Sequence, residues 1–189
     1  MPTLISGSTG IDKVQDSSIT SAKIEDGAIT NTDINSSAAI VGSKLVMPTG
    51  SVLQVQSFYY GTNFVSSSNQ ATAATGLKKA ITPSATSSKI LVLVNINGIK
   101  KDAASNWLQF ELKCGSHETK RIERHYGYYG WQTEITAMGP IGFSYLSSPS
   151  TTSSIEYEVF MGVWDGSGTS EINLWGDSSS SITLLEIAG

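Results

Sequence analysis

The sequence predicts an all-β protein in which an antiparallel β-sandwich follows a thin, repeat-built segment. Three observations lead to this prediction. Charged residues make up only 15% of the chain, so its polarity comes mostly from Ser, Thr, Asn and Gly, which suit strands and turns. Apolar and polar residues alternate in short runs from about residue 50 onward. Before that point, an aliphatic residue recurs at a step of five.

The two parts of the chain differ in composition on either side of residue 47. All aromatic residues lie at or after Phe58. A segment without aromatic residues buries little apolar surface per residue and cannot hold a compact core alone. Pro48 and Gly50 mark the boundary, because both residues interrupt regular structure. We therefore predict residues 1–46 as a stem that also attaches to a partner, and residues 47–189 as a β-sandwich head.

The aliphatic residues of the predicted stem recur every fifth position, with one slip of a single residue. A step of five turns about 500° around an α-helix, so these side chains would not share one face. In a flat strand, an odd step puts successive side chains on opposite faces. The chain must therefore bend or wind once per repeat, which returns each aliphatic residue to a common axis. The residues are Val14, Ile19, Ile24, Ile29, Ile34, Ile40 and Leu45.

Three arrangements of this repeat are open. A single-chain solenoid of the pentapeptide-repeat kind needs several stacked coils, whereas about five clean repeats complete little more than one coil. A tether that becomes ordered only on docking is the second arrangement. In the third, several chains wind round one axis, and each contributes one aliphatic residue per layer. We favour this multi-chain stem, with the seven aliphatic residues as its core.

The head is predicted to contain eight or so short strands joined by turns rich in Gly, Asp, Ser and Pro. The run at 89–99 is apolar on both faces, which is typical of a central strand buried on both sides. Strands in this number and without a helical period indicate a jelly-roll sandwich. The strong runs lie at 50–58, 89–99, 107–114, 155–163, 171–175 and 181–187, and weaker runs lie near 69–81, 119–126 and 133–146.

Charge and hydropathy exclude several classes of function. A net charge of −4 argues against nucleic-acid binding, which needs clustered Lys and Arg. No apolar run approaches the ~20 residues that a membrane-spanning helix requires. The single cysteine, Cys114, lies in an alternating run and is expected to be buried. We expect no nucleic-acid partner and no membrane insertion.

The sequence contains no arrangement typical of a catalytic or metal site. The two histidines, His117 and His125, lack the spacing of common metal motifs. Glu156 and Glu158 alternate with apolar residues, so we expect them to face solvent rather than to form an acid–base pair. The GSG at 166–168 lacks the surroundings of a serine nucleophile. We therefore predict a protein that is not an enzyme and that has no catalytic residues, metal or cofactor.

The repeat ITSAKIEDGAITNTDI at 19–34 resembles shaft repeats in tail-fibre proteins of tailed bacteriophages. The segments at 47–55 (MPTGSVLQV), 143–159 and 178–189 resemble the heads of such proteins, especially those of marine and cyanobacterial phages. The resemblance implies a homotrimeric virion fibre that is made in the host cytoplasm and has a C1q-like or tumour-necrosis-factor-like jelly-roll head. It also implies contact with other virion proteins through the N-terminal segment, and attachment to a host-surface glycan or protein.

Two other functions fit the same residues. One is a capsid-bound head fibre or decoration protein, which differs only in its place on the particle. The other is a glycan-degrading tailspike enzyme, which would need a pair of acidic residues beside the bound glycan.

The segment HYGYYGW at 125–131 is the best candidate for receptor binding. Glycine spacing prevents its four aromatic residues from all pointing into one sheet core. Exposed aromatic rings can stack on the C–H faces of sugars or anchor a protein interface. The open alternative is that some of these rings pack into the head core or a seam between subunits. The candidate residues are Tyr126, Tyr128, Tyr129 and Trp131.

Trp164 and Trp175 form a second candidate, because each is followed by an Asp-containing turn. Tryptophans at the ends of strands more often cap a core, and we favour that interpretation for both.

Overall fold

The computed structural model describes residues 20–30, 32–38, 40, 46–103, 107–127, 135–164 and 168–189. The chain divides into two compact units, Met1–Val46 and Met47–Gly189. Within the described ranges, no helix is long and apolar enough to cross a membrane.

Between residues 20 and 38, the described part of the first unit makes a backbone turn at every fifth residue. One of these turns is the short 3-10 helix η1 (Ser21–Lys23). The Asp33 carboxylate closes another turn, because it accepts hydrogen bonds from the Thr30 N–H at 2.8 Å and the Thr30 hydroxyl at 2.7 Å. The predicted bend is therefore present in the repeats that the structure describes. The backbone bonds span 2.8–3.0 Å and run from the N–H of Lys23, Ala28, Asp33 and Ala38 to the carbonyl oxygens of Thr20, Glu25, Thr30 and Asn35 respectively.

The isoleucines of this unit are exposed in a single copy of the chain. Ile24 is 41% exposed, Ile29 58%, Ile34 40% and Ile40 49%. Every described residue of the unit is exposed, so one copy alone does not bury these side chains. Val14, Ile19 and Leu45 lie outside the described residues. The assignment of all seven residues to a multi-chain core stays a prediction.

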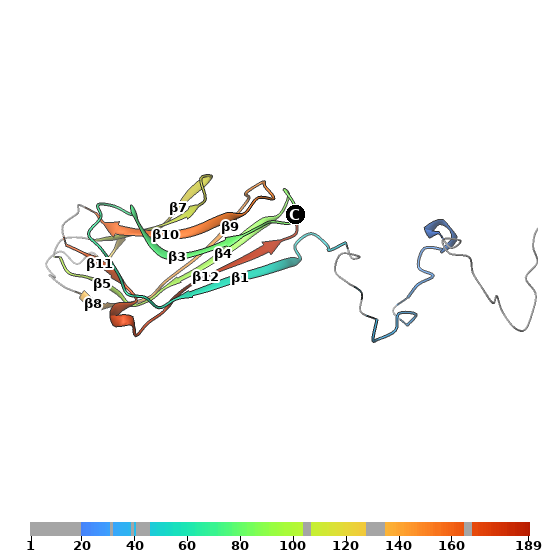
Figure 1. Cartoon of the computed structure of the whole chain (residues 1–189), viewed down its shortest axis with the longest axis horizontal. Helices are drawn as coiled ribbons and strands as arrows, with labels where there is room; N and C mark the ends of the chain where they lie inside the picture. The colour runs from blue at the N-terminus through green and yellow to red at the C-terminus, as the bar shows by residue number, and fades with distance from the viewer. Residues whose placement is uncertain are drawn as a thin grey trace, which may run out of the picture. The chain divides into compact units, whose positions relative to one another are not determined.

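The second unit is built from strands (Figure 1). Each strand begins and ends near residues that favour turns, as the alternating runs of the sequence predict. The strands are β1 (Val52–Tyr60), β2 (Phe64–Ser66), β3 (Ala73–Ile81), β4 (Lys89–Ile96), β5 (Ile99–Lys101), β6 (Leu108–Cys114), β7 (Glu118–Tyr126), β8 (Ile135–Met138), β9 (Ile141–Ser147), β10 (Ile155–Val163), β11 (Ser170–Ile172) and β12 (Ser180–Ile187).

The strands form three four-stranded sheets with antiparallel pairing throughout. Sheet I has the order β1-β12-β4-β9 and sheet II the order β3-β10-β6-β7. These two sheets are the layers of a sandwich (Figure 1). Sheet III, with the order β2-β11-β5-β8, continues sheet I strand by strand toward the end of the unit opposite the C-terminus. The predicted all-β fold, an antiparallel sandwich of jelly-roll type, is confirmed.

The core lies between sheets I and II and is formed by alternate residues of each strand. On β4, for example, Ile90 and Val92 are fully buried. Cys114 is 2% exposed, which confirms the prediction that it is a buried residue. Burial raises the pKa of its thiol to about 11, so the thiol stays protonated at neutral pH. Other core side chains include Leu77, Leu108, Phe110, Leu112, Tyr157, Val159, Met161, Ile182 and Leu184.

Two runs that were predicted as single strands are both interrupted, at the point where their backbones contact each other. The run at 89–99 is divided into β4 and β5, and the run at 171–175 ends early and is followed by the 3-10 turn η3 (Leu174–Gly176). Gly98 has φ +58°, and a Cβ on it would lie 2.5 Å from the Leu174 nitrogen. The Leu174 N–H donates to the Gly98 carbonyl at 3.1 Å. Close approach of two distant backbones therefore breaks both strands, and alternation within one run cannot predict it.

Candidate functional site

The outer faces of the two main sheets differ in their chemistry. On sheet II, Lys78 and Glu156 form an ion pair with an N–O distance of 3.2 Å. The Lys113 ammonium lies 3.6 Å from the centre of the Phe160 ring. Charged side chains of this kind are usual on the solvated face of an antiparallel sheet. They also support the prediction that Glu156 faces solvent.

The outer face of sheet I carries an apolar row that crosses all four strands. Val55 of β1 pairs with Leu185 of β12, Leu185 pairs with Leu91 of β4, and Leu91 pairs with Leu146 of β9. Val55 is 54% exposed and Leu146 48%, and the two central members are partly buried. We call these four residues the apolar row.

The rows on either side of the apolar row add apolar surface and little charge. Leu93 is 40% exposed and Val52 49%. Lys89 is the one charged residue in these flanking rows. The prediction that the 89–99 run is buried on both faces is therefore wrong for a single copy. A large apolar patch on the surface indicates an interaction surface. The flanking rows are Ser57, Thr183, Leu93 and Ser144 on one side, and Val52, Ile187 and Lys89 on the other.

The predicted receptor-binding aromatics divide into one residue that the structure describes and three that it does not. Tyr126 is half-buried and meets the core residue Phe110 edge to face, with 6.5 Å between ring centres. Its hydroxyl donates a hydrogen bond to the Gly139 carbonyl. Tyr126 therefore packs against the core, which is the alternative to receptor binding that the sequence left open. Tyr128, Tyr129 and Trp131 lie outside the described residues, and their binding role stays a prediction.

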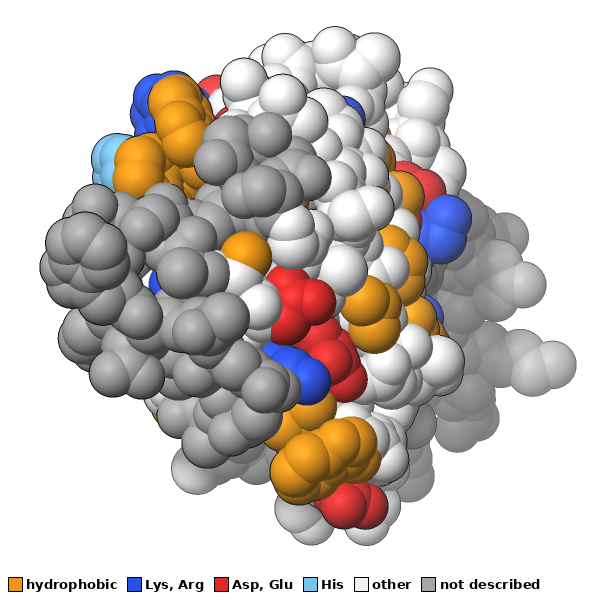
Figure 2. All heavy atoms as spheres, turned by 90° about the vertical axis from the view of Figure 1, so that its left-hand side faces the viewer, with side chains coloured by type: hydrophobic (Ala, Val, Ile, Leu, Met, Phe, Trp, Pro, Cys, Tyr) orange, Lys and Arg blue, Asp and Glu red, His pale blue; other side chains and the backbone are white. Residues whose placement is uncertain are grey.

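A stack of four side chains holds the ends of β6, β7 and β10 together. The Trp107 and Trp164 rings are stacked with their centres 5.3 Å apart. The Arg124 guanidinium lies 4.5 Å from the Trp164 ring centre, and the His125 ring lies 5.1 Å from that of Trp107. Figure 2, which views this end of the molecule, shows hydrophobic side chains beside basic ones and a histidine at its margin. Trp164 is half-buried and contacts both Trp107 and Arg124, whereas the interpretation that it caps the core stays a prediction.

Trp175 behaves differently, since it is 74% exposed in the turn η3. Its backbone has φ +57° and ψ 7°, a left-handed conformation that is unfavourable for a bulky side chain. Capping of a core is therefore the wrong interpretation for this tryptophan. A strained residue with an exposed aromatic ring is more often found at binding sites than elsewhere.

The turn that carries Trp175 is held by the buried Asn173. The Asn173 side chain donates hydrogen bonds to the carbonyl oxygens of Tyr60 at 2.8 Å and Thr62 at 3.0 Å. Its amide oxygen accepts a bond from the Ser180 hydroxyl at 2.7 Å. This network joins the ends of β1 and β12 to the turn and fixes Asn173, two residues before Trp175.

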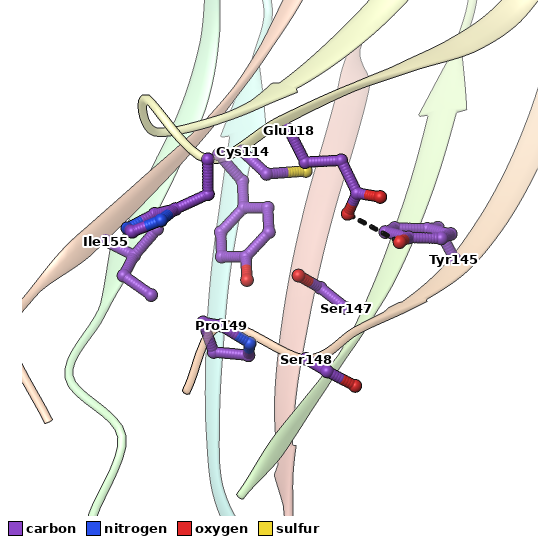
Figure 3. A pocket seen from close by; sticks show the side chains of 9 residues that line it. Cys114, Glu118, Tyr145, Ser147, Ser148, Pro149 and Ile155 are labelled. Carbon is purple, nitrogen blue, oxygen red and sulfur yellow. Dashed lines mark hydrogen bonds between the residues drawn. The ribbon is translucent and has the colours of Figure 1, made fainter. Parts of the chain in front are cut away.

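A cavity of about 300 Å³ lies where the edge strands β7 and β9 leave the sandwich open. Figure 3 shows Tyr145 of β9 and Glu118 of β7 meeting across this opening, with Pro149 and Ile155 on the opposite side of Ser147. The Tyr145 hydroxyl donates to the Glu118 carboxylate at 2.5 Å. The residues that line the cavity are Cys114, His117, Glu118, Tyr145, Ser147, Ser148, Pro149, Ile155 and Tyr157.

Lys120 and Glu118 place opposite charges at the mouth of this cavity. The Lys120 ammonium forms an ion pair with Glu118 and lies 4.8 Å from the centre of the Tyr145 ring. Hydrogen bonds from Lys120 and Tyr145 lower the pKa of Glu118, so this carboxylate is ionised at neutral pH. Burial and the Glu118 contact raise the pKa of Tyr145, which keeps its hydroxyl protonated. The mouth of the cavity therefore carries the Glu118–Lys120 ion pair, and the Tyr and Ser residues that line the cavity supply neutral hydroxyls.

Tyr157 contributes a hydroxyl that the described part of the chain does not satisfy. The residue is fully buried, and its Oη atom has no hydrogen-bond partner among the described residues. Burial raises the pKa of Tyr157 to about 12, and the Ser147 hydroxyl acts against this rise without reaching hydrogen-bond geometry. An unsatisfied buried hydroxyl costs about 1–3 kcal/mol of stability.

The structure places the two histidines in unrelated surroundings. His117 lines the cavity, whereas His125 belongs to the aromatic stack. Within the described ranges, no three His, Cys, Asp or Glu side chains are grouped so that they could hold a metal ion.

Sequence reasoning did not identify the cavity or the apolar row. A partial signal existed for the cavity, because Tyr145 and Ser147 are polar residues at inward positions of an alternating strand. No comparable signal existed for the apolar row, since an outward leucine on one strand cannot be matched to its neighbours before the strand order is known.

Comparisons with known proteins do not identify a family. No family model matches the sequence, and no curated protein matches it significantly. Similar solved structures include that of the infectious bursal disease virus Gx strain, with TM-score 0.37, 12% identity, and coverage of 73% of this chain and 33% of that one. Another is the VP2 subviral particle of the same virus, with TM-score 0.39, 14% identity, and coverage of 80% and 37%. The chain thus spans little more than a third of these proteins, and at such low TM-scores no conclusion about function rests on the likeness.

Proposed function

We propose that the protein is a viral structural protein without catalytic activity, and that it forms a homotrimeric fibre through the outer face of sheet I. The apolar row is the observation that carries this proposal. The row crosses the whole width of the sheet, so its two ends can meet different neighbours around a three-fold axis. Because the face carries little charge, identical copies do not repel one another there.

The repeats of the first unit support the same assembly. Each described isoleucine follows or lies near a turn and remains 40–58% exposed in one copy. Full burial of such a side chain contributes about 1.5–3 kcal/mol, so association around a common axis would stabilise every layer. A single chain obtains only part of this stabilisation at the described positions.

Introducing charge into the apolar row is expected to abolish assembly. In the double variant Val55→Glu with Leu146→Glu, each trimer would bury six carboxylates at its interfaces, and burying unpaired charges is strongly unfavourable. The wild-type chain should show three times the chain mass in light scattering, and the variant should show the mass of one chain. Both positions are about half exposed in one copy, so the head itself should remain folded.

A matched control places the same two charges on the outer face of sheet II. Ala74 and Thr119 are exposed on β3 and β7, and the variant Ala74→Glu with Thr119→Glu should keep the wild-type mass. A wild-type chain of monomeric mass would refute the assembly. A trimer that survives the Val55 and Leu146 changes would exclude the outer face of sheet I as its interface.

Attachment to a host-surface glycan or protein is the finer part of the proposal, and Trp175 supports it. An exposed tryptophan with positive φ costs the fold stability and gains little packing, whereas an exposed indole suits a binding surface. The same features would serve a tail fibre and a capsid-bound head fibre. Labelling the chain on intact particles and imaging its position would separate these two locations.

Replacing Trp175 with Asn is expected to raise the free energy of unfolding by about 1 kcal/mol. Asn tolerates the left-handed conformation that costs a bulky residue about 1–2 kcal/mol, and little packing is lost from a side chain that is 74% exposed. Urea unfolding at a fixed protein concentration measures the change. Trp164→Asn, which disrupts the aromatic stack, should destabilise instead. A destabilised Trp175 variant would mean that the indole serves packing.

A further inference from the structure

The half-open cavity between β7 and β9 has the size of a small-ligand site. Its volume of about 300 Å³ lies at the lower end of the range of about 300–1,000 Å³ for ligand pockets. Residues from β6, β7, β9 and β10 line it, so both layers of the sandwich contribute to its walls. The Glu118–Tyr145 hydrogen bond fixes the two edge strands relative to each other at its mouth (Figure 3).

The Tyr157 hydroxyl is difficult to explain by folding alone. Phenylalanine would fill the same space between the sheets without an unsatisfied buried hydroxyl. Tyr157 lines the cavity, and Ser147, which is 4% exposed, lines it beside Tyr157. A buried polar atom without a partner among the described residues is a place where a water, an ion or a ligand group can bind.

The remaining groups define the chemistry of that partner. Glu118 at the rim is paired with the Lys120 ammonium, so the rim carries no net charge, which favours a neutral ligand. Ser147 and Tyr157 can both donate and accept, which matches the hydroxyls of a sugar. Pro149 and Ile155 form an apolar side opposite Tyr145, which matches the C–H face of a sugar ring. A small neutral molecule rich in hydroxyl groups matches the hydroxyls and the apolar side of this cavity.

We propose that this cavity binds a neutral sugar ring, with Tyr157 and Ser147 hydrogen-bonded to its hydroxyls and Glu118 at its rim. The source is a free monosaccharide or the terminal residue of a surface glycan. Only the second source rests on the attachment function proposed above. The cavity lies within one head, so the proposal does not depend on trimer formation.

The decisive variant is Tyr157→Phe, because it separates binding from folding. Removing the unsatisfied hydroxyl should leave the melting temperature unchanged or raise it. The same change should weaken sugar binding at least tenfold. Tyr59→Phe is the matched control: Tyr59 is 75% exposed on β1, and its change should alter neither property.

The whole 189-residue chain is titrated with D-glucose, D-galactose and D-mannose. Binding is measured by calorimetry and by the NMR chemical-shift changes of the residues that line the cavity. Lactose tests whether a terminal galactose of a longer glycan binds better than free galactose. Light scattering on the same samples shows whether assembly is intact, so a failed assembly is distinguished from a failed site. The proposal predicts binding of at least one sugar with shifts at Ser147 and Tyr157.

Three results would overturn the proposal. The first is the absence of binding to all of these sugars at tens of millimolar. The second is a Tyr157→Phe variant that binds as well as the wild type, as would occur if only water meets the hydroxyl. The third is a clear loss of stability in Tyr157→Phe, because the hydroxyl would then have a structural partner.

Discussion

Replacing Glu186 with Gln is expected to lower the free energy of unfolding by about 3 kcal/mol. Glu186 is fully buried on β12 and anchors the loop between β3 and β4. Its Oε1 atom accepts hydrogen bonds from the Ser84 N–H, the Ser84 hydroxyl and the Ser88 hydroxyl, each at 2.6 Å. Its Oε2 atom accepts one from the Gln54 amide at 2.6 Å. A neutral glutamine weakens all of these bonds and turns an NH₂ group toward one of the donors.

The same carboxylate should make the head sensitive to acid. Burial acts to raise the pKa of Glu186, but the hydrogen bonds from Ser84, Ser88 and Gln54 outweigh burial and lower the pKa from 4.5 to about 2. The folded state therefore holds the carboxylate ionised, and its contribution is complete above about pH 4.5. As the pH falls from there toward 2, the unfolded state takes up the proton first, and about 3 kcal/mol of stability is lost.

Urea unfolding at pH 7 and pH 3 tests both statements. The difference between the wild type and Glu186→Gln should be large at pH 7 and smaller at pH 3. Protein concentration must be held constant, since association contributes to apparent stability. Glu111→Gln makes the same chemical change on the outer face of sheet II and should cost less than about 0.5 kcal/mol. A difference that does not shrink in acid would contradict the ionised, hydrogen-bonded state of Glu186.

Replacing Gly162 with Ala is expected to destabilise the head by at least about 3 kcal/mol or to prevent folding. A Cβ on Gly162 would lie 1.5 Å from the Gln70 carbonyl oxygen and 2.6 Å from that of Ser68. The backbone at 68–70 lies against β10 and cannot easily move away, because two hydrogen bonds hold it there. The Gln70 N–H donates to the Val163 carbonyl at 2.6 Å, and the Val163 N–H donates to the Ser68 carbonyl at 2.9 Å.

Gly142→Ala provides the matched control for this change. Gly142 also lies in a strand, β9, but nothing is within 4 Å of a Cβ placed on it. Circular dichroism and thermal unfolding should show a wild-type-like Gly142→Ala protein and a severely destabilised or unfolded Gly162→Ala protein. A Gly162→Ala protein with wild-type stability would show that the segment at 68–70 does not cross β10 as closely as described.

Features that depend on neighbouring residues were predictable from the sequence. Alternation at 107–114 and 155–163 depends on the two-residue period of a strand, and both runs became strands with their apolar side chains in the core. The five-residue period likewise implied one bend per repeat. The turns at Thr20 and Thr30 are local hydrogen bonds between residues three apart.

Features that depend on distant pairing were not predictable. The outward side chains of the 89–99 run look like those of a strand buried on both faces, and only the strand order shows that Leu91 lies in an apolar row on an uncovered face. Trp164 and Trp175 occupy similar places in the sequence. Trp164 is stacked on Trp107 and contacts Arg124, whereas Trp175 is exposed, because a separate backbone contact bends the chain after β11.

The sequence by itself determined the class of the fold, the strands of its core and the bend in each repeat, because these follow from periods of two and five residues. Only the tertiary structure decided where polar groups meet inside the head. Gln54 and Glu186 are 132 residues apart in the chain yet share a hydrogen bond. Glu118 and Tyr145 close the cavity from the edges of opposite sheets. Such contacts depend on strand order and register, which alternation within a single strand leaves open.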